Sequence, residues 1–426
     1  MKQQRAGSPP SWLNLDNAAK IYPAARSKSW MPMFRVSITF LEDIDHALMQ
    51  RALDAAVRRV PFFGYRLRRG LFWYYLESQK ERPQVEEDAR NPMLPLNLTQ
   101  GRRFLFRLRV HKRRAALEVF HALTDGYGAT VFLVTLAAEY LYLRTGKRME
   151  AGGMVLDTRE RPRPEEWEDS FPRYARARAG SRREQSAWQL RGTAVPRGFL
   201  RVITGLVPTQ QLLELARGMG TTINNLLAAL LLRSLMRQKE GSLRMRRRPV
   251  KLSLPVNLRK YYPSGTLRNF SFYVNVPVHT GQEPDSLEGL IDYLTHYMGL
   301  ETMEHRLNVR FSANVKAERN KLLRVAPLFL KTMVLKIMYR FTGERYMTTT
   351  LTNLGRIALP QGMEEQVKRM NLVLGPARRT PLGCAVISAA GQTCISFSKS
   401  IRETEVERDF FTSLVQLGIP VTIQSN

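Results

Sequence analysis

The stretch "FHALTDGYGA", from Phe120 to Ala129, joins two segments with different hydrophobic patterns. The residues before it, "RRAALEVF", alternate and end in β-formers, which predicts a strand. The residues after its glycines, "ATVFLVTLAAEYLYLR", have helical spacing and contain no helix breaker. His121 therefore lies where a strand gives way to a loop that leads into a helix. Functional side chains concentrate in such loops because a rigid scaffold positions them.

Three residues make this loop a candidate site: His121, then Asp125 and Gly126. An imidazole can accept a proton near neutral pH. A carboxylate four residues further on can orient the loop or bind a cation, and the small residues of "GYG" let another backbone or a substrate approach closely. The alternative is a structural histidine that only bonds a carbonyl at the strand end.

The composition favours a globular protein with two domains. The chain has 426 residues, of which 44% are hydrophobic, so it can build more than one core and is not generally disordered. No apolar run reaches about 18 residues without a charge, which argues against a membrane span. The N-terminal "MKQQRAGSPPSWLNLDNAAK" has no apolar segment of the signal-peptide kind. We therefore expect a cytoplasmic protein.

The two cysteines, Cys384 and Cys394, lie in "LGCAVISAAGQTCISFSK". This segment predicts a hairpin that turns near Ala390–Gly391. Symmetry about that turn places Cys384 opposite position 397 and not opposite Cys394, so no disulfide is expected. Metal-ligand spacing of Cys and His is also missing from the sequence, and no metal is predicted.

The charge is strongly positive, with 66 Lys and Arg against 37 Asp and Glu and a net charge of +29. Two explanations stay open: a compositional bias toward Arg, or an acidic partner. The densest run, "RMRRRP" from Arg244 to Pro249, has no interleaved aromatic residues and belongs to no nucleic-acid motif. A specific nucleic-acid partner is therefore not expected.

Strands and helices alternate on both sides of a charged, Pro-containing stretch that ends near Ser186. We predict an N-terminal subdomain over residues 1–150, a charged crossover over 151–190 and a C-terminal subdomain over 191–426. The fold class is α/β with mixed sheets. Ser286 to about Arg319 predicts one long helix. The apolar, basic stretch 321–341 predicts a helix that packs over the second sheet, with peripheral contact to a membrane as the alternative.

The sequence "HALTDG" resembles the His-x-x-x-Asp-Gly signature of the chloramphenicol-acetyltransferase-like superfamily. This superfamily includes peptide-synthetase condensation domains, polyketide-associated acyltransferases and alcohol acetyltransferases. The segments "LDNAAKIYP", "LDAAVRRVPFFGYRLRRG", "LPVNLRKYYP" with "RNFSF", and "TNLGRIALP" are similar to the alcohol-acetyltransferase-like branch. The resemblance covers nearly the whole chain. The Asp-Phe-Gly-Trp-Gly motif of the plant branch is missing, and "RNFSF" stands roughly at its place.

The resemblance implies two similar subdomains in a pseudo-dimeric V, with a tunnel between them. His121 would lie in the tunnel as general base for an acceptor hydroxyl or amine that attacks a thioester directly. Asp125 would point away and pair with an Arg, for which Arg259 is the match, and Gly126 would keep the loop tight. The second half would supply the donor to the oxyanion, and its candidates are Asn269, Thr352 and Asn353.

The chain has one copy of the motif and no carrier domain, so the resemblance implies a diffusing acyl donor. No cofactor is expected to stay bound; the co-substrate would be acyl-CoA or the phosphopantetheine thioester of an acidic acyl carrier protein. The acceptor would be a small or lipid-like molecule, and a monomer suffices. A non-catalytic relative that binds acyl thioester, lipid or a carrier protein is the alternative. Candidate contacts to the donor phosphates are Arg246, Arg247, Arg248 and Arg102–Arg103.

Overall fold

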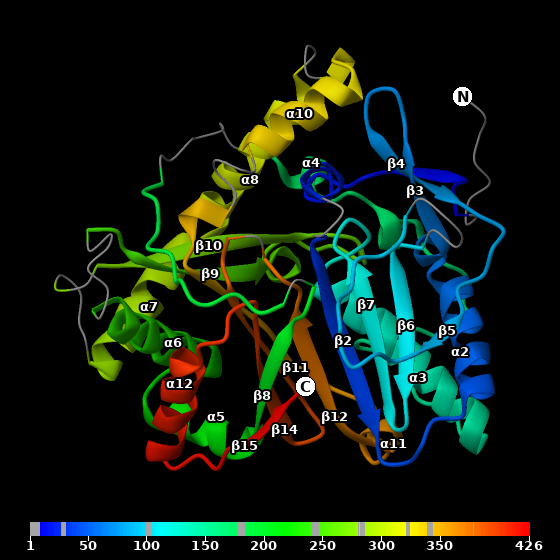
Figure 1. Ribbon diagram of the computed structural model, residues 1–426. Helices are drawn as coiled ribbons and strands as arrows, with labels where there is room; N and C mark the ends of the chain where they lie inside the picture. Colours follow the sequence, from blue (N-terminus) through cyan, green and yellow to red (C-terminus); the bar gives the residue numbers. More distant parts are fainter. Residues whose placement is uncertain are drawn as a thin grey trace.

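The protein has two sheet-containing halves, each covered by helices, and a small third sheet at one edge (Figure 1). Each half has its own apolar core. The α/β class with mixed sheets is therefore confirmed. The computed structural model describes residues 9–26, 31–98, 104–176, 184–196, 198–240, 247–279, 281, 286–320, 324–338, 344–377 and 379–426.

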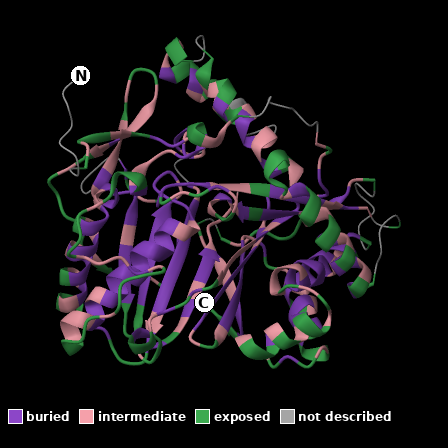
Figure 2. Ribbon diagram, turned by 180° about the vertical axis from the view of Figure 1, so that it is seen from behind, coloured by how far each residue is buried: buried purple, intermediate pink, exposed green. Residues whose placement is uncertain are grey.

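The N-terminal sheet has five strands in the order β12-β2-β7-β6-β5. Its central strands are buried on both faces, because helices cover one side and the other half of the molecule lies on the other (Figure 2). The strands are β2 (Met33–Phe40), β5 (Val85–Glu87), β6 (Phe106–His111), β7 (Arg114–Phe120) and β12 (Val367–Leu374). The helices of this half are α2 (His46–Arg59) and α3 (Gly126–Thr145).

The C-terminal sheet has seven strands in the order β10-β9-β11-β13-β14-β8-β15. They are β8 (Arg201–Pro208), β9 (Val250–Asn257), β10 (Ser271–Val278), β11 (Thr349–Arg356), β13 (Leu382–Ala389), β14 (Gln392–Lys399) and β15 (Thr422–Ser425). The helices around it are α5 (Thr209–Gly218), α6 (Ile223–Glu240), α7 (Leu287–Glu301) and α12 (Glu405–Gln416). The third sheet comprises β1 (Trp12–Asn14), β4 (Tyr74–Ser78) and β3 (Tyr65–Arg69).

The cysteine hairpin is confirmed in its register. Cys384 pairs with Phe397 across β13 and β14, and the chain turns at Ala390 and Gly391, which have φ values of 47° and 73°. Both cysteines are free and buried. Burial raises the pKa of the Cys394 thiol to about 12, so neither the pairing nor the environment favours a reactive cysteine here.

β12 follows β11 in the chain, yet it pairs antiparallel with β2 in the N-terminal sheet. Met370 and Leu372 of this strand are buried in the N-terminal core. The division into subdomains at 1–150, 151–190 and 191–426 stays a prediction. This division does not anticipate β12, which belongs to the C-terminal part of the sequence but pairs in the N-terminal sheet. The strand therefore links the two halves.

The prediction of a single helix from Ser286 to Arg319 is wrong, because two helices cover this range. α7 ends at Glu301, and α8 (Glu304–Arg319) begins after an extended Met303. Glu301 is 2% exposed, and its carboxylate forms an ion pair with Arg306 at 2.7 Å. This ion pair joins the end of α7 to the start of α8 and so stabilises the bend between them.

The helix expected within residues 321–341 forms as α10 (Leu328–Met338), but its predicted packing over the second sheet is wrong. α10 packs against the short helix α1 (Ile21–Ala25) at the edge of the molecule (Figure 1). The second sheet is already covered by α5, α6 and α7, which leaves α10 no place on it. Residues 339–341 and 321–323 lie outside the described ranges.

Within the described residues, one helix, α3, has the length and apolar composition needed to cross a membrane. However, 72% of its most apolar window is buried inside the protein. A helix that is apolar all round and buried all round is typical of a protein core. α3 therefore gives the loop that carries His121 a rigid base.

Candidate active site

His121 directly follows β7 and is held between two aromatic rings. Its backbone N–H donates to Pro32 O at 3.0 Å. Tyr22 of α1 stacks on the imidazole at 4.8 Å between ring centroids, and Phe34 of β2 meets it edge-on at 5.0 Å. The side chain is half-buried, so the ring is fixed in position but not sealed off from small molecules.

The tautomer of His121 follows from its bond to Asn269. His121 Nδ1 lies 2.9 Å from Asn269 Oδ1. Asn269 Nδ2 donates to Asp16 Oδ2 and to His121 O, both at 3.1 Å. Because the amide nitrogen must face these two acceptors, the amide oxygen faces the ring and Nδ1 carries the proton. Nε2 is then unprotonated, and its lone pair is available to accept a proton.

The surroundings keep the imidazole neutral. Burial lowers the pKa of His121, and the charge of Asp125 and the bond to Asn269 oppose this shift only in part. Asp16 is fully buried, and burial raises the pKa of its carboxyl against the effect of Arg268, whose nearest guanidinium nitrogen is 3.4 Å away. His121 therefore has the protonation state of a general base.

We expect Asn269→Asp to shift the acid limb of the kcat/KM profile by about one to three units toward higher pH. Only a neutral imidazole can accept a proton, so a rate that depends on His121 as the proton acceptor falls as pH falls through its pKa, which burial lowers in the wild type. A carboxylate beside Nδ1 stabilises the imidazolium and raises that pKa. Gln424→Glu adds the same charge on exposed β15 and is the control. An unshifted limb in Asn269→Asp would mean that His121 does not titrate in the measured step.

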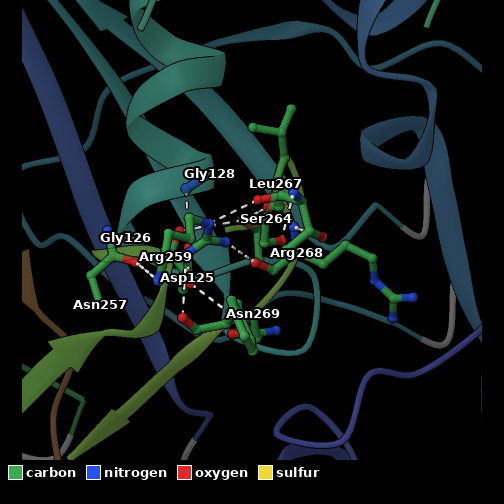
Figure 3. Close-up of polar contacts among 12 residues, drawn as sticks. Asp125, Gly126, Gly128, Asn257, Arg259, Ser264, Leu267, Arg268 and Asn269 are labelled. Carbon is green, nitrogen blue, oxygen red and sulfur yellow. Dashed lines mark hydrogen bonds and ion pairs between the residues drawn. The ribbon is translucent and has the colours of Figure 1, made fainter. Parts of the chain in front are cut away.

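Asp125 holds the loop from the other side (Figure 3). Its Oδ1 accepts from Gly128 N at 3.1 Å and so caps α3. Its Oδ2 accepts from Arg259 Nη1 at 2.8 Å and from Phe270 N at 2.9 Å. Asp125 is 3% exposed, and these three bonds tie its carboxylate to α3, Arg259 and Phe270. The structure thus brings Asp125 and Arg259 together, as the resemblance implied.

Arg259 follows β9 and links this cap to the loop before β10. Its guanidinium donates to the carbonyl oxygens of Thr266, at 2.9 Å, and of Arg268. It also lies over the Tyr127 ring, at 4.6 Å from the centroid. Since the same loop carries Asn269, Arg259 fixes the distance between the His121 loop and the residue that sets its tautomer (Figure 3).

The closest backbone approach is at Gly128 rather than at Gly126, where we predicted a tight loop. A Cβ at Gly128 would lie 2.0 Å from Leu267 O and 2.2 Å from Thr124 Oγ1. A Cβ at Gly126 would meet only the tip of the Leu354 side chain, at 2.9 Å. A backbone oxygen in a hydrogen-bonded loop cannot move aside as a leucine methyl can.

Gly128→Ala should therefore destabilise the protein by about 3 kcal/mol or more, whereas Gly126→Ala should cost about 1 kcal/mol. Urea unfolding of the two variants measures the difference. Equal losses would show that the approach of Leu267 to α3 is not the constraint.

The three residues predicted to bind the oxyanion are Asn269, Thr352 and Asn353. Asn269 has both amide hydrogens occupied, so it orients His121 and is not free to bind an oxyanion. Thr352 and Asn353 lie half-buried on β11, and Asn353 Oδ1 accepts from Gly355 N at 2.8 Å. Leu354, the next residue on β11, packs on Gly126, so this strand end adjoins the loop. Their oxyanion role stays a prediction.

Arg247 and Arg248 precede β9, whereas Arg259 follows it. A strand of this length spans about 25 Å, so these two arginines are not brought to His121. Arg246 and Arg102–Arg103 lie outside the described residues. Contact of these arginines with donor phosphates stays a prediction. In the described part of the chain, no group of His, Cys, Asp and Glu is arranged to hold a metal.

Sequence reasoning missed Asp16 and Tyr22, which complete the surroundings of His121. Both belong to "LDNAAKIYP", which was quoted for its family resemblance but given no role at the site. The available signal was that resemblance: a segment similar to relatives and adjacent to no predicted core element has a reason to contact the site.

Several solved structures share this architecture over nearly their whole length. No family model matches the chain, and no curated protein matches it by sequence. Polyketide synthase associated protein 5 from Mycobacterium tuberculosis aligns with a TM-score of 0.59 and 15% identity over 97% of this chain and 99% of that one. The first condensation domain of the calcium-dependent antibiotic synthetase aligns at 0.60 and 16%, over 96% and 97%.

The chain has the chloramphenicol-acetyltransferase-like fold. TRI101 of F. sporotrichioides, solved with coenzyme A and T-2, shares it with a TM-score of 0.59 and 12% identity over 97% of this chain and 99% of that one. The resemblance inferred from "HALTDG" and its neighbouring segments is thus confirmed at the level of the fold. Since the alignments cover both halves, the fold accounts for the whole chain.

Proposed function

We propose that this protein is an acyltransferase that moves an acyl group from a thioester donor to a hydroxyl or amine acceptor, with His121 as general base. The observation that carries the proposal is the Asn269 bond to His121 Nδ1, which leaves Nε2 free as the basic nitrogen. A neutral imidazole held rigidly at the end of a strand is suited to proton transfer near pH ~7.

The proposed reaction is a direct transfer. His121 Nε2 takes the proton of the acceptor O–H or N–H while the acceptor atom attacks the thioester carbonyl carbon. The C–S bond of the resulting tetrahedral species then breaks, the acyl group stays on the acceptor, and the imidazolium returns its proton to the leaving thiolate. No acyl-enzyme forms, and both described cysteines are buried with raised thiol pKa values.

Asp125 and Arg259 are positioning residues in this proposal, since neither touches the reacting atoms. The donor is acyl-CoA or the phosphopantetheine thioester of an acyl carrier protein. The coenzyme A bound in TRI101 of F. sporotrichioides and the condensation domains among the structural neighbours support a thioester of this kind. The net charge of +29 suits either the CoA phosphates or an acidic carrier.

The test is the release of free thiol from acetyl-CoA and longer acyl-CoAs with a panel of alcohols and amines. Acceptor-dependent release that scales with protein concentration is the expected result, with the acylated acceptor detected by mass spectrometry. If CoA donors give none, the same assay with acyl-loaded carrier protein follows. Silence with both donors, together with measurable donor binding, would support the non-catalytic alternative instead.

A further inference from the structure

The helix α10 exposes four apolar side chains and buries one lysine, which is unusual for a helix in water. The side chains of Phe329, Leu330, Met333 and Val334 are 60%, 41%, 54% and 48% exposed. Lys331, between them in sequence, is only 5% exposed. A helix at an aqueous surface normally buries its apolar stripe and presents its lysines to solvent.

The buried lysine is held inside by specific contacts. Lys331 Nζ donates to Phe72 O at 3.1 Å and to Arg324 O at 3.0 Å, and lies 4.2 Å from the centroid of the Trp73 ring. Burial lowers the pKa of this amine. These contacts hold Lys331 inward, and Phe329 and Leu330 beside it in sequence face outward.

The exposed apolar surface continues onto the turn between β3 and β4. Leu71 and Phe72 at this turn are 73% and 42% exposed, and Leu328 N donates to Leu71 O at 2.9 Å. Val325, just before α10, is 64% exposed. We call the exposed side chains of Leu71, Phe72, Val325, Phe329, Leu330, Met333 and Val334 the α10 patch. Contiguous apolar surface of this kind is rare on a soluble monomer without a binding role.

The charged residues within the two segments that carry the patch are all basic. Arg69, Arg324 and Lys336 are exposed beside it. Residues 66–76 and 324–338 contain no Asp or Glu. Exposed apolar side chains interspersed with exposed cations match a bilayer interface, where the apolar groups enter the acyl boundary and the cations meet anionic headgroups.

We propose that the α10 patch binds the surface of an anionic phospholipid bilayer. The protein lies on the bilayer without crossing it. The apolar side chains of the patch insert at the level of the headgroups, while Arg69, Arg324 and Lys336 contact the anionic lipids. A second copy of the chain offers no complementary anionic surface at its own patch, so self-association through this face would bring like charges together.

The patch is also connected to the candidate site. α10 packs against α1, and α1 carries Tyr22, which stacks on His121. A bilayer under α10 is thus separated from His121 by one short helix. Resting on the proposed function, this places the acceptor in the bilayer: a lipid or other membrane-held molecule with a free hydroxyl or amine.

The experiment is flotation of the full-length protein with vesicles of phosphatidylcholine alone and of phosphatidylcholine mixed with phosphatidylglycerol. We expect the wild type to float with the anionic vesicles and much less with the neutral ones. The double variant Phe329→Ser/Met333→Ser should lower the partition coefficient by about tenfold or more. Val415→Ser removes an equally exposed apolar side chain from α12, far from α10, and should bind as the wild type does.

Two results would overturn the proposal: equal binding of the wild type and the double variant to anionic vesicles, or a wild-type oligomer that the double variant dissociates while neither binds vesicles. Both substituted side chains are exposed, so an unchanged melting temperature is expected and shows that folding is intact. Vesicle binding is measured without any acyl donor, so its failure is distinguishable from a failure of acyl transfer. The double variant should keep its activity toward a water-soluble acceptor. Loss of that activity would mean that the two substitutions disturb the His121 site itself, and not only the binding of the bilayer.

Discussion

His121→Ala should lower kcat/KM for acceptor-dependent thiol release by about 10²- to 10⁴-fold, the usual contribution of a general base. The substitution removes the free Nε2 and leaves the loop, since Asp125 still caps α3 and binds Arg259. The melting temperature should therefore change little compared with the rate.

His296→Ala is the matched control, because His296 is exposed on α7 and its ring bonds Asp292 O of the same helix. It should retain wild-type kinetics. Equal rates in His121→Ala and the wild type would remove His121 from the chemistry and assign any thiol release to background.

Arg259→Met should cost about 3–5 kcal/mol of unfolding free energy, because it leaves the buried Asp125 carboxylate without its cation. The ion pair is 2.8 Å long, and the two side chains are 7% and 5% exposed. Chemical denaturation followed by circular dichroism measures the loss.

Arg237→Met is the control for this experiment. Arg237 forms an ion pair of 2.6 Å with Asp409, but its side chain is 53% exposed, so the cost should stay within about 1 kcal/mol. A double variant, Asp125→Asn/Arg259→Met, should be more stable than Arg259→Met alone, since no charge is left buried. Equal losses of unfolding free energy in Arg259→Met and Arg237→Met would show that the ion pair between Asp125 and Arg259 does not stabilise the contact between the two halves.

Local sequence patterns predicted the parts of the fold that depend on neighbours in the chain. The turn at Ala390 and Gly391 set the register of Cys384 against Phe397, because a hairpin's register follows from its turn. The strand, loop and helix around His121 were likewise readable from the change of period. β12 was not, since its partner β2 lies more than 300 residues away in sequence and no local pattern encodes that pairing.

The residues of the candidate site that belong to a sequence motif could be predicted. The contacts that depend only on the three-dimensional arrangement could not. The pairing of Asp125 with Arg259 came from the family resemblance. The task of Asn269 depends on which of its amide atoms faces the His121 ring, and the positions of Asp16 Oδ2 and His121 O decide that. The packing of α10 over the second sheet was mispredicted because an apolar, basic pattern predicts a helix but not the element against which it packs.

The most direct measurement is ¹⁵N NMR of histidine-labelled protein over a pH titration, with the His121 signals assigned by comparison with His121→Ala. The chain has six histidines, which keeps the spectrum tractable. We expect a neutral ring with the proton on Nδ1 and a bare Nε2, and a pKa below the ordinary value near 6.5. A proton on Nε2, or an imidazolium that persists at pH ~7, would contradict the role of His121 as the base.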